Sequence, residues 1–120
     1  MAIKIGTCPD SWGIWFPQDE KQVSWQTCLD EMAKAGYNAL ELGPWGYLPT
    51  DAATLHQELA ARDLELVSTT IMSDLTSQQN IDQVILPTVD QMARLLADFP
   101  ETRTIILMDN TYSDLWTGEL

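Results

Sequence analysis

Four short apolar segments alternate with three amphipathic stretches along the chain, and this alternation limits the folds open to it. The apolar segments are residues 2–7, 38–42, 65–71 and 104–108. Between them, apolar residues recur at the spacing of three and four that a helix with one buried face requires. Strands that alternate with helices pair in parallel through right-handed crossovers. The sequence therefore predicts an α/β fold with four parallel strands and three helices.

The first two predicted helices carry clear signals at their ends. Ser24 is expected to cap the first helix, with Lys34 in its last turn and Gly36 just beyond it. Thr50 or Asp51 is expected to cap the second helix.

The third predicted helix contains a proline. Asn80 and Gln83 resemble a capping box at its start. The apolar period then runs over residues 81–99 and survives Pro87, so a kink is expected there and not a break. Residues 109–120 are expected to form a loop.

The two faces of the predicted strands differ in polarity, which helps to choose between parallel architectures. One face is apolar and the other is polar: Ile3, Ile5, Leu40 and Leu42 share the first, and Lys4, Glu41, Ser68 and Thr70 the second. An open, doubly wound sheet has helices on both sides and is apolar on both. A polar, ligand-facing interior favours a barrel, and a small flavodoxin-like open sheet is kept as the weaker alternative.

The chain length accounts for only part of such a barrel. A complete eight-unit barrel takes about 250 residues, whereas this chain has 120. We therefore expect a single partial (β/α)-barrel domain over residues 1–120, the N-terminal half of a barrel. Half a barrel leaves two open sheet edges, so a missing C-terminal half or a second copy in a homodimer is expected to complete it.

Charge and cysteine content exclude several classes of partner. The net charge is −12, which disfavours nucleic acid and anionic membranes. We expect no secretory signal, and the sequence has no apolar run long enough to span a bilayer. Cys8 and Cys28 give no disulfide framework, so both are expected to be reduced thiols in a cytoplasmic protein.

Three segments resemble a known superfamily. They are D-S-W-G-I-W-F-P at 10–17, A-G-Y-N-A-L-E-L-G-P-W-G-Y-L-P-T at 35–50, and L-A-A-R-D-L-E-L-V at 59–67. Their order and spacing are similar to those of the xylose-isomerase-like TIM-barrel superfamily, in particular sugar-phosphate isomerase/epimerase-type proteins and the inosose dehydratases of inositol catabolism. The resemblance implies isomerisation, epimerisation or dehydration of a sugar or polyol. It also implies a divalent metal (Mn, Mg, Co or Zn) in the full-length family member, held by ligands on later strands, so no metal ligand or cofactor is assigned within this chain.

Glu41 is the candidate catalytic residue. It ends a predicted strand on the polar face, and barrel enzymes place functional groups at the carboxyl ends of their strands. Its carboxylate would bind a sugar hydroxyl or transfer a proton. The structural alternative is a carboxylate paired with a residue such as Lys4.

Aromatic residues and aspartates at the same end are candidate substrate-binding groups. The aromatic residues are Trp12, Trp15, Trp45 and Tyr47. Their rings can stack on the C–H face of a sugar, or can pack the loops over the barrel. Asp109 follows the fourth strand as Asp10 and Asp74 follow the first and third, and each can bind a ligand or cap a turn. His56, the only histidine, lies in a predicted helix, where packing is expected.

Two functional hypotheses follow. The first is the N-terminal part of a sugar or polyol isomerase, epimerase or dehydratase that acts by metal-assisted proton transfer, inactive as this chain alone. The alternative is a non-catalytic half-barrel that assembles as a homodimer or binds a small molecule.

Overall fold

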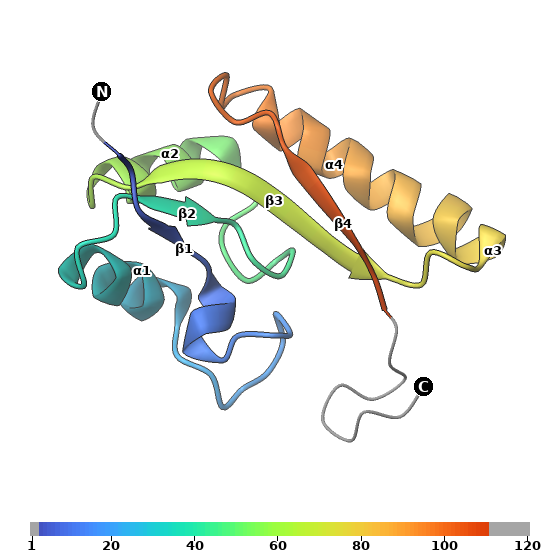
Figure 1. Cartoon of the computed structure of the whole chain (residues 1–120), viewed down its shortest axis with the longest axis horizontal. Coiled ribbons are helices and arrows are strands. Elements are labelled where there is room, and N and C mark those ends of the chain that lie inside the picture. The colour runs from blue at the N-terminus through green and yellow to red at the C-terminus, as the bar shows by residue number, and fades with distance from the viewer. Residues whose placement is uncertain (1–2, 111–120) are drawn as a thin grey trace.

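A parallel sheet and the helices that connect its strands make up the fold (Figure 1). The structure, a computed structural model, describes residues 3–110. The strands are β1 (Gly6–Thr7), β2 (Ala39–Glu41), β3 (Glu65–Ser73) and β4 (Ile105–Asp109). The connections contain α1 (Trp25–Lys34), α2 (Ala52–Ala60) and a continuous third helix built from α3 (Gln78–Asn80), η2 (Ile81–Ile85) and α4 (Leu86–Leu96). The predicted α/β class, with four parallel strands and three helical connections, is confirmed.

The strand order follows the chain order, β1-β2-β3-β4, and every neighbouring pair is parallel. A doubly wound sheet of the flavodoxin type reverses its order at a switch point. No reversal occurs among the strands described, so the arrangement agrees with a partial parallel α/β barrel and not with the open-sheet alternative.

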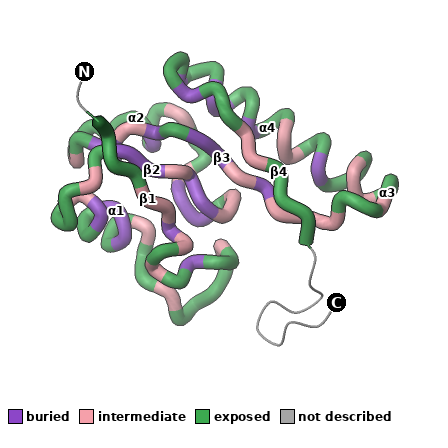
Figure 2. Tube along the Cα trace, in the orientation of Figure 1, coloured by how far each residue is buried: buried purple, intermediate pink, exposed green. Residues whose placement is uncertain are grey.

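The main hydrophobic core lies between the helices and one face of the sheet, and a smaller cluster of Ile71, Ile85 and Met92 lies between β3 and the third helix. Each of the three helical connections contributes buried side chains to the same cluster as Leu40 of β2 and Leu66 of β3; these are Cys28, Leu29, Met32, Leu55, Leu59, Leu95 and Leu96. Figure 2 shows buried segments in β2, in the loop that follows it, in β3 and in the helices. Because all helices cover the same face, the opposite face is left to polar side chains and loops.

The two edge strands are poorly covered. Ile3 and Ile5 were expected on the helix-covered face, but they are 90% and 61% exposed. The prediction is wrong because β1 is a two-residue edge strand that begins only at Gly6, so Ile3 and Ile5 precede it. At the other edge, Leu107 of β4 is 53% exposed. Apolar side chains are therefore open to solvent on both edges of the sheet.

The first two helix caps are as predicted, and the third differs. The Ser24 hydroxyl accepts a hydrogen bond from the Thr27 amide at 3.2 Å, and the Asp51 carboxylate accepts one from the Thr54 amide at 2.8 Å. The third helix is capped by Ser77 and not by Asn80, since the helix begins at Gln78, two residues before the predicted capping box.

The third helix crosses Pro87 without interruption. The turn before the proline widens into a π turn, in which the Leu86 amide donates to the Ile81 carbonyl five residues back. Proline has no amide proton to donate, and a wider turn is one way in which a helix accommodates this loss. Among the described helices, none has the length and apolar character needed to cross a membrane.

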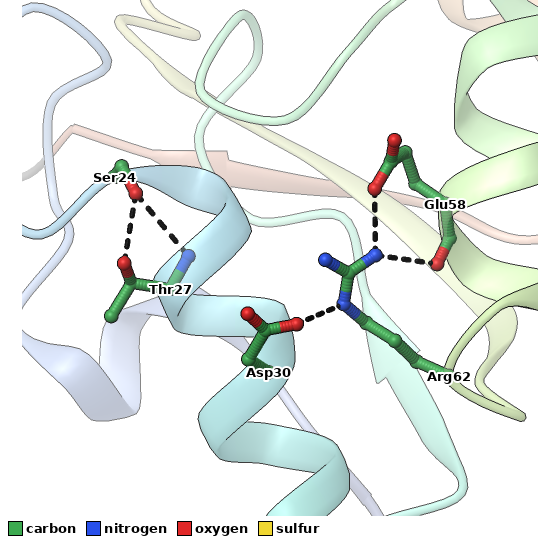
Figure 3. A network of polar contacts seen from close by, with 5 residues as sticks. All are labelled: Ser24, Thr27, Asp30, Glu58 and Arg62. Atoms are coloured by element: carbon green, nitrogen blue, oxygen red, sulfur yellow. Dashed lines mark hydrogen bonds and ion pairs between the residues drawn. The ribbon is translucent and has the colours of Figure 1, made fainter.

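Arg62 joins the first two helices through a partly buried polar network (Figure 3). Its Nε lies 2.6 Å from Asp30 of α1, and its Nη1 lies 2.6 Å from the Glu58 carboxylate of α2. Nη1 also donates to the Glu58 carbonyl oxygen at 2.9 Å, and the side chain is only 15% exposed. The guanidinium thus holds α1 beside the end of α2.

Replacing Arg62 with alanine should destabilise the fold more than the same change at Arg94. Arg62→Ala removes a partly buried ion pair with Glu58 and a more exposed one with Asp30, and we expect a loss of about 1–2 kcal/mol of unfolding free energy. Arg94 is 78% exposed and pairs only with Asp90 of its own helix, so Arg94→Ala should cost under about 0.5 kcal/mol. Urea denaturation measures both, and equal losses would contradict this role for Arg62.

Candidate functional site

A β-bulge in the middle of the sheet places Glu41 among hydroxyl groups. Leu40 pairs with Leu66, but the next residue, Glu41, pairs with Ser68, so Val67 is the extra residue. The bulge turns Leu66 toward the core and Ser68 toward the opposite face. There Ser68 donates a hydrogen bond to the Glu41 carboxylate at 3.3 Å, and Thr70 donates another. Two hydroxyls on the neighbouring strand therefore fix the orientation of this carboxylate.

A second carboxylate, that of Asp10, is held close to Glu41 by the short 3₁₀ helix η1 (Pro9–Trp12) that follows β1. Burial, followed by the nearby negative charge of Glu41, raises the pKa of Asp10 above its ordinary value. Its Oδ1 is buried and has no hydrogen-bond partner among the residues that the structure describes.

Close packing fixes the position of η1 against the end of β2. Gly43 adopts a left-handed backbone conformation with φ of 72°, and a Cβ atom there would lie 2.7 Å from ring atoms of Pro9. Only glycine permits this approach without strain. The contact ties the loop that carries Asp10 to the strand end that carries Glu41.

A cavity of about 310 Å³, here called the mouth cavity, opens at the carboxyl ends of the strands. Its polar groups include Asp10, Glu41 and Thr70, and its apolar wall includes Trp15, Phe16, Trp45, Met72 and Met108. Strands β2, β3 and β4, η1 and the loops after η1 and β2 all contribute residues. This is the end at which parallel barrels bind their ligands.

Of the predicted aromatic residues, the structure brings Trp15 and Trp45 to the mouth cavity. Trp45 also donates from its indole nitrogen to the Gln91 side chain at 3.3 Å. Trp12 instead donates to Glu31 at 2.7 Å and packs edge-on against Tyr37. Tyr47 is 7% exposed and donates to the Val23 carbonyl oxygen at 2.8 Å, so it packs beneath the loops.

The remaining candidates lie outside the lining of the cavity. Asp109 accepts a hydrogen bond from the Leu75 amide at 3.0 Å, across the loop that follows β3. Asp74 accepts hydrogen bonds from the side chain and amide of Thr76, which lower its pKa. His56 stacks on Phe99 and donates to a main-chain carbonyl oxygen at 2.6 Å, in agreement with a packing role.

Lys4 does not pair with Glu41, although the structural alternative for Glu41 in the sequence analysis had suggested this pairing. Its ammonium group pairs with Glu65 at the start of β3. Glu41 lies at the other end of the sheet, beside Ser68 and Thr70.

Several residues of the apolar wall were absent from the predicted site, among them Phe16, Met72 and Met108. Strand parity could have found Met72, since it lies two residues beyond Thr70 on the polar face. Phe16 carries no such signal, because the direction of a loop side chain is not set by periodicity.

The described residues do not form a complete metal site. They contain no group of three or more His, Cys, Asp or Glu side chains placed to hold a metal ion. Asp10 and Glu41 supply two carboxylates, whereas hard divalent ions take six or more oxygen ligands. The divalent metal implied by the superfamily therefore does not fit these residues alone.

Fold and site together define the class of this chain as a partial parallel α/β barrel with a ligand-sized cavity at the carboxyl ends of its strands. Sequence comparison identifies curated proteins that are similar to this chain. The chain is 33% identical over 79 residues to an inosose dehydratase of Lacticaseibacillus casei, covering 65% of this chain and 26% of the relative. It is 31% identical over 77 residues to that of Clostridium perfringens (strain 13 / Type A), covering 63% and 25%. Identity to that of Bacillus cereus (strain AH820) is 31% over 78 residues, covering 64% and 26%.

These matches establish a distant, partial homology to inosose dehydratases, which are xylose-isomerase-like TIM-barrel enzymes. The matched segment spans about a quarter of the length of these curated relatives. No protein-family model and no solved structure matches the chain.

Substituting Gly43 should disturb the site as well as the fold. Gly43→Ala introduces left-handed strain of about 1 kcal/mol and forces Pro9 away, which adds about 1–3 kcal/mol. Gly13 has a similar φ of 76° but open space around it, so Gly13→Ala should cost only the left-handed strain of about 1 kcal/mol. Urea denaturation of the two variants compares them. Equal destabilisation of the two variants would show that the contact between Gly43 and Pro9 does not contribute to stability.

Proposed function

We propose that this chain forms part of the polyol-binding pocket of an inosose-dehydratase-like barrel, with Glu41 as a proton-transfer group. The observation that carries the proposal is the oriented Glu41 carboxylate in a ligand-sized cavity with aromatic walls. The homology to inosose dehydratases supports a cyclic polyol ketone as the ligand.

The chemistry of a dehydratase suits such a pocket. Loss of water from a hydroxyketone begins when a base removes the proton from the carbon beside the carbonyl group. A carboxylate held by two hydroxyls is positioned to accept this proton. Isomerisation and epimerisation of sugars can begin with the same step, so Glu41 would serve either reaction. The rings of Trp15 and Trp45 would contact the C–H face of the ligand.

We expect the chain to bind ligand but not to turn it over by itself. The metal-binding groups that the superfamily implies are not assembled among the described residues. A cytoplasmic location is part of the proposal, and the two free thiols support it. Burial raises the pKa of Cys28 to about 11, so this thiol is unreactive at neutral pH.

The proposal predicts that an inosose binds to the mouth cavity and that Glu41→Gln weakens this binding about tenfold, the equivalent of one lost charge-assisted hydrogen bond. Titration calorimetry measures the affinity, and quenching of tryptophan fluorescence reports contact with Trp15 and Trp45. Glu65→Gln is the matched control, since Glu65 pairs with Lys4 away from the cavity. Equal affinities of the wild type and Glu41→Gln would contradict the role of Glu41.

A second candidate function, a half-barrel homodimer, rests on the exposed apolar side chains at both sheet edges. We propose that two copies join so that β4 of each lies beside β1 of the other. Two four-stranded sheets would then close an eight-stranded parallel barrel about a two-fold axis. The pairing would cover Ile3 and Ile5 on one edge and Leu107 on the other, which are 90%, 61% and 53% exposed.

Salt should strengthen this association, because each copy carries a net charge of −12 and salt screens the repulsion. Light scattering coupled to size-exclusion chromatography should show a dimer whose fraction rises with sodium chloride. Leu107→Lys at the edge should give a monomer, while Leu86→Lys on α4 should not, although Leu86 is equally exposed at 55%. A wild-type chain that stays monomeric at high concentration and high salt would overturn the homodimer.

A further inference from the structure

We propose that Asp10 is the acid that works with Glu41 in the mouth cavity, donating a proton to the hydroxyl group that leaves the polyol ketone. This inference rests on the proposed function, because it assigns a second catalytic residue to the same cavity. The proposed function assigns a catalytic role to Glu41 alone, whereas this inference also specifies which group protonates the departing hydroxyl so that it leaves as water.

The geometry of the cavity singles out Asp10. Asp10 and Glu41 line the same cavity from η1 and from the end of β2. The Glu41 carboxylate is engaged by Ser68 and Thr70, whereas Oδ1 of Asp10 is buried and has no partner among residues 3–110. A buried polar atom without a partner costs free energy that a bound group can recover. A ligand hydroxyl in the cavity would supply that partner.

The surroundings of the two carboxylates suit opposite roles. Burial, and after it the charge of Glu41, raises the pKa of Asp10, so Asp10 holds its proton to higher pH than an ordinary aspartate. Glu41 accepts hydrogen bonds from two hydroxyls, as the proton acceptor of the pair requires. Neighbouring carboxyl groups in different environments are a recurring basis for dividing acid and base roles.

In a complete barrel that contains this chain, the proton transfers of the dehydration balance. Glu41 takes the proton from the carbon beside the ketone, and the electron pair of that C–H bond forms a C=C bond. The C–O bond to the departing hydroxyl breaks, and the Asp10 proton joins that oxygen, so that water leaves. Glu41 is then protonated and Asp10 is charged, and return of the proton from Glu41 to Asp10 restores the starting state without an external reactant.

The test monitors the Asp10 carboxyl carbon by ¹³C NMR across a pH titration of the full chain. We expect Asp10 to titrate above the ordinary aspartate range, and Glu41→Gln to move its midpoint toward that range by removing the facing charge. Asp10→Asn should raise the melting temperature at pH 7 to 8. A group with a raised pKa stabilises the fold below its unfolded pKa and loses that contribution as the pH rises through its folded pKa. Asp19→Asn, an exposed turn residue, is the control and should leave the melting temperature unchanged.

Ligand binding then separates this inference from the proposed function. Inosose affinity of the wild type should fall as the pH rises through the Asp10 midpoint, and Asp10→Asn should abolish this dependence. No inosose binding at any pH would contradict the proposed function, while the NMR titration would still report on Asp10. Titration of Asp10 in the ordinary range, unchanged in Glu41→Gln, would overturn the assignment even if inosose binds.

Discussion

The rest of the structure depends on the burial of a single face of the sheet. The three helical connections pack on Leu40 and Leu66 in one cluster, so the apolar side chains of β2 and β3 are drawn to that side. Polar side chains of the same strands are left on the other side, where Glu41 meets Ser68 and Thr70. The hydrophobic core thus determines where the candidate site lies, although few of its residues belong to that site.

Periodicity and end signals predicted the elements of the fold because they reflect local chemistry. Ser24 and Asp51 cap helices as expected, and the parallel sheet follows from the alternation of strands and helices. The bulge at Val67 was not predictable in this way. In a regular strand, Leu66 and Ser68 would share a face, and only the pairing of β3 with β2 decides that one enters the core while the other turns toward Glu41.

Loop residues were harder to assign than strand residues. Trp12 and Trp15 are close in the sequence, yet one packs on Tyr37 and the other lines the mouth cavity. The direction of each ring depends on tertiary packing, which includes the contact of Pro9 with Gly43. The placement of Glu41 at the end of β2 therefore followed from strand geometry, whereas the placement of the loop side chains followed from the sequence only in part. Whether the predicted domain extends over residues 1–120 stays a prediction, since residues 1–2 and 111–120 lie outside those described.

The π turn allows the third helix to contact both the end of β3 and the hydrophobic core. An extra residue in a turn rotates the rest of the helix by about 100° relative to an uninterrupted α-helix. Before the turn, Asn80 is fastened to the end of β3 by a hydrogen bond to Ser73. After it, Met92 and Leu95 face the core, while Thr88 lines the mouth cavity. Deleting one residue within 81–85 would restore a regular helix. The part of the helix before the π turn and the part after it could then no longer make both sets of contacts, so the irregular turn fixes the rotation of one part relative to the other.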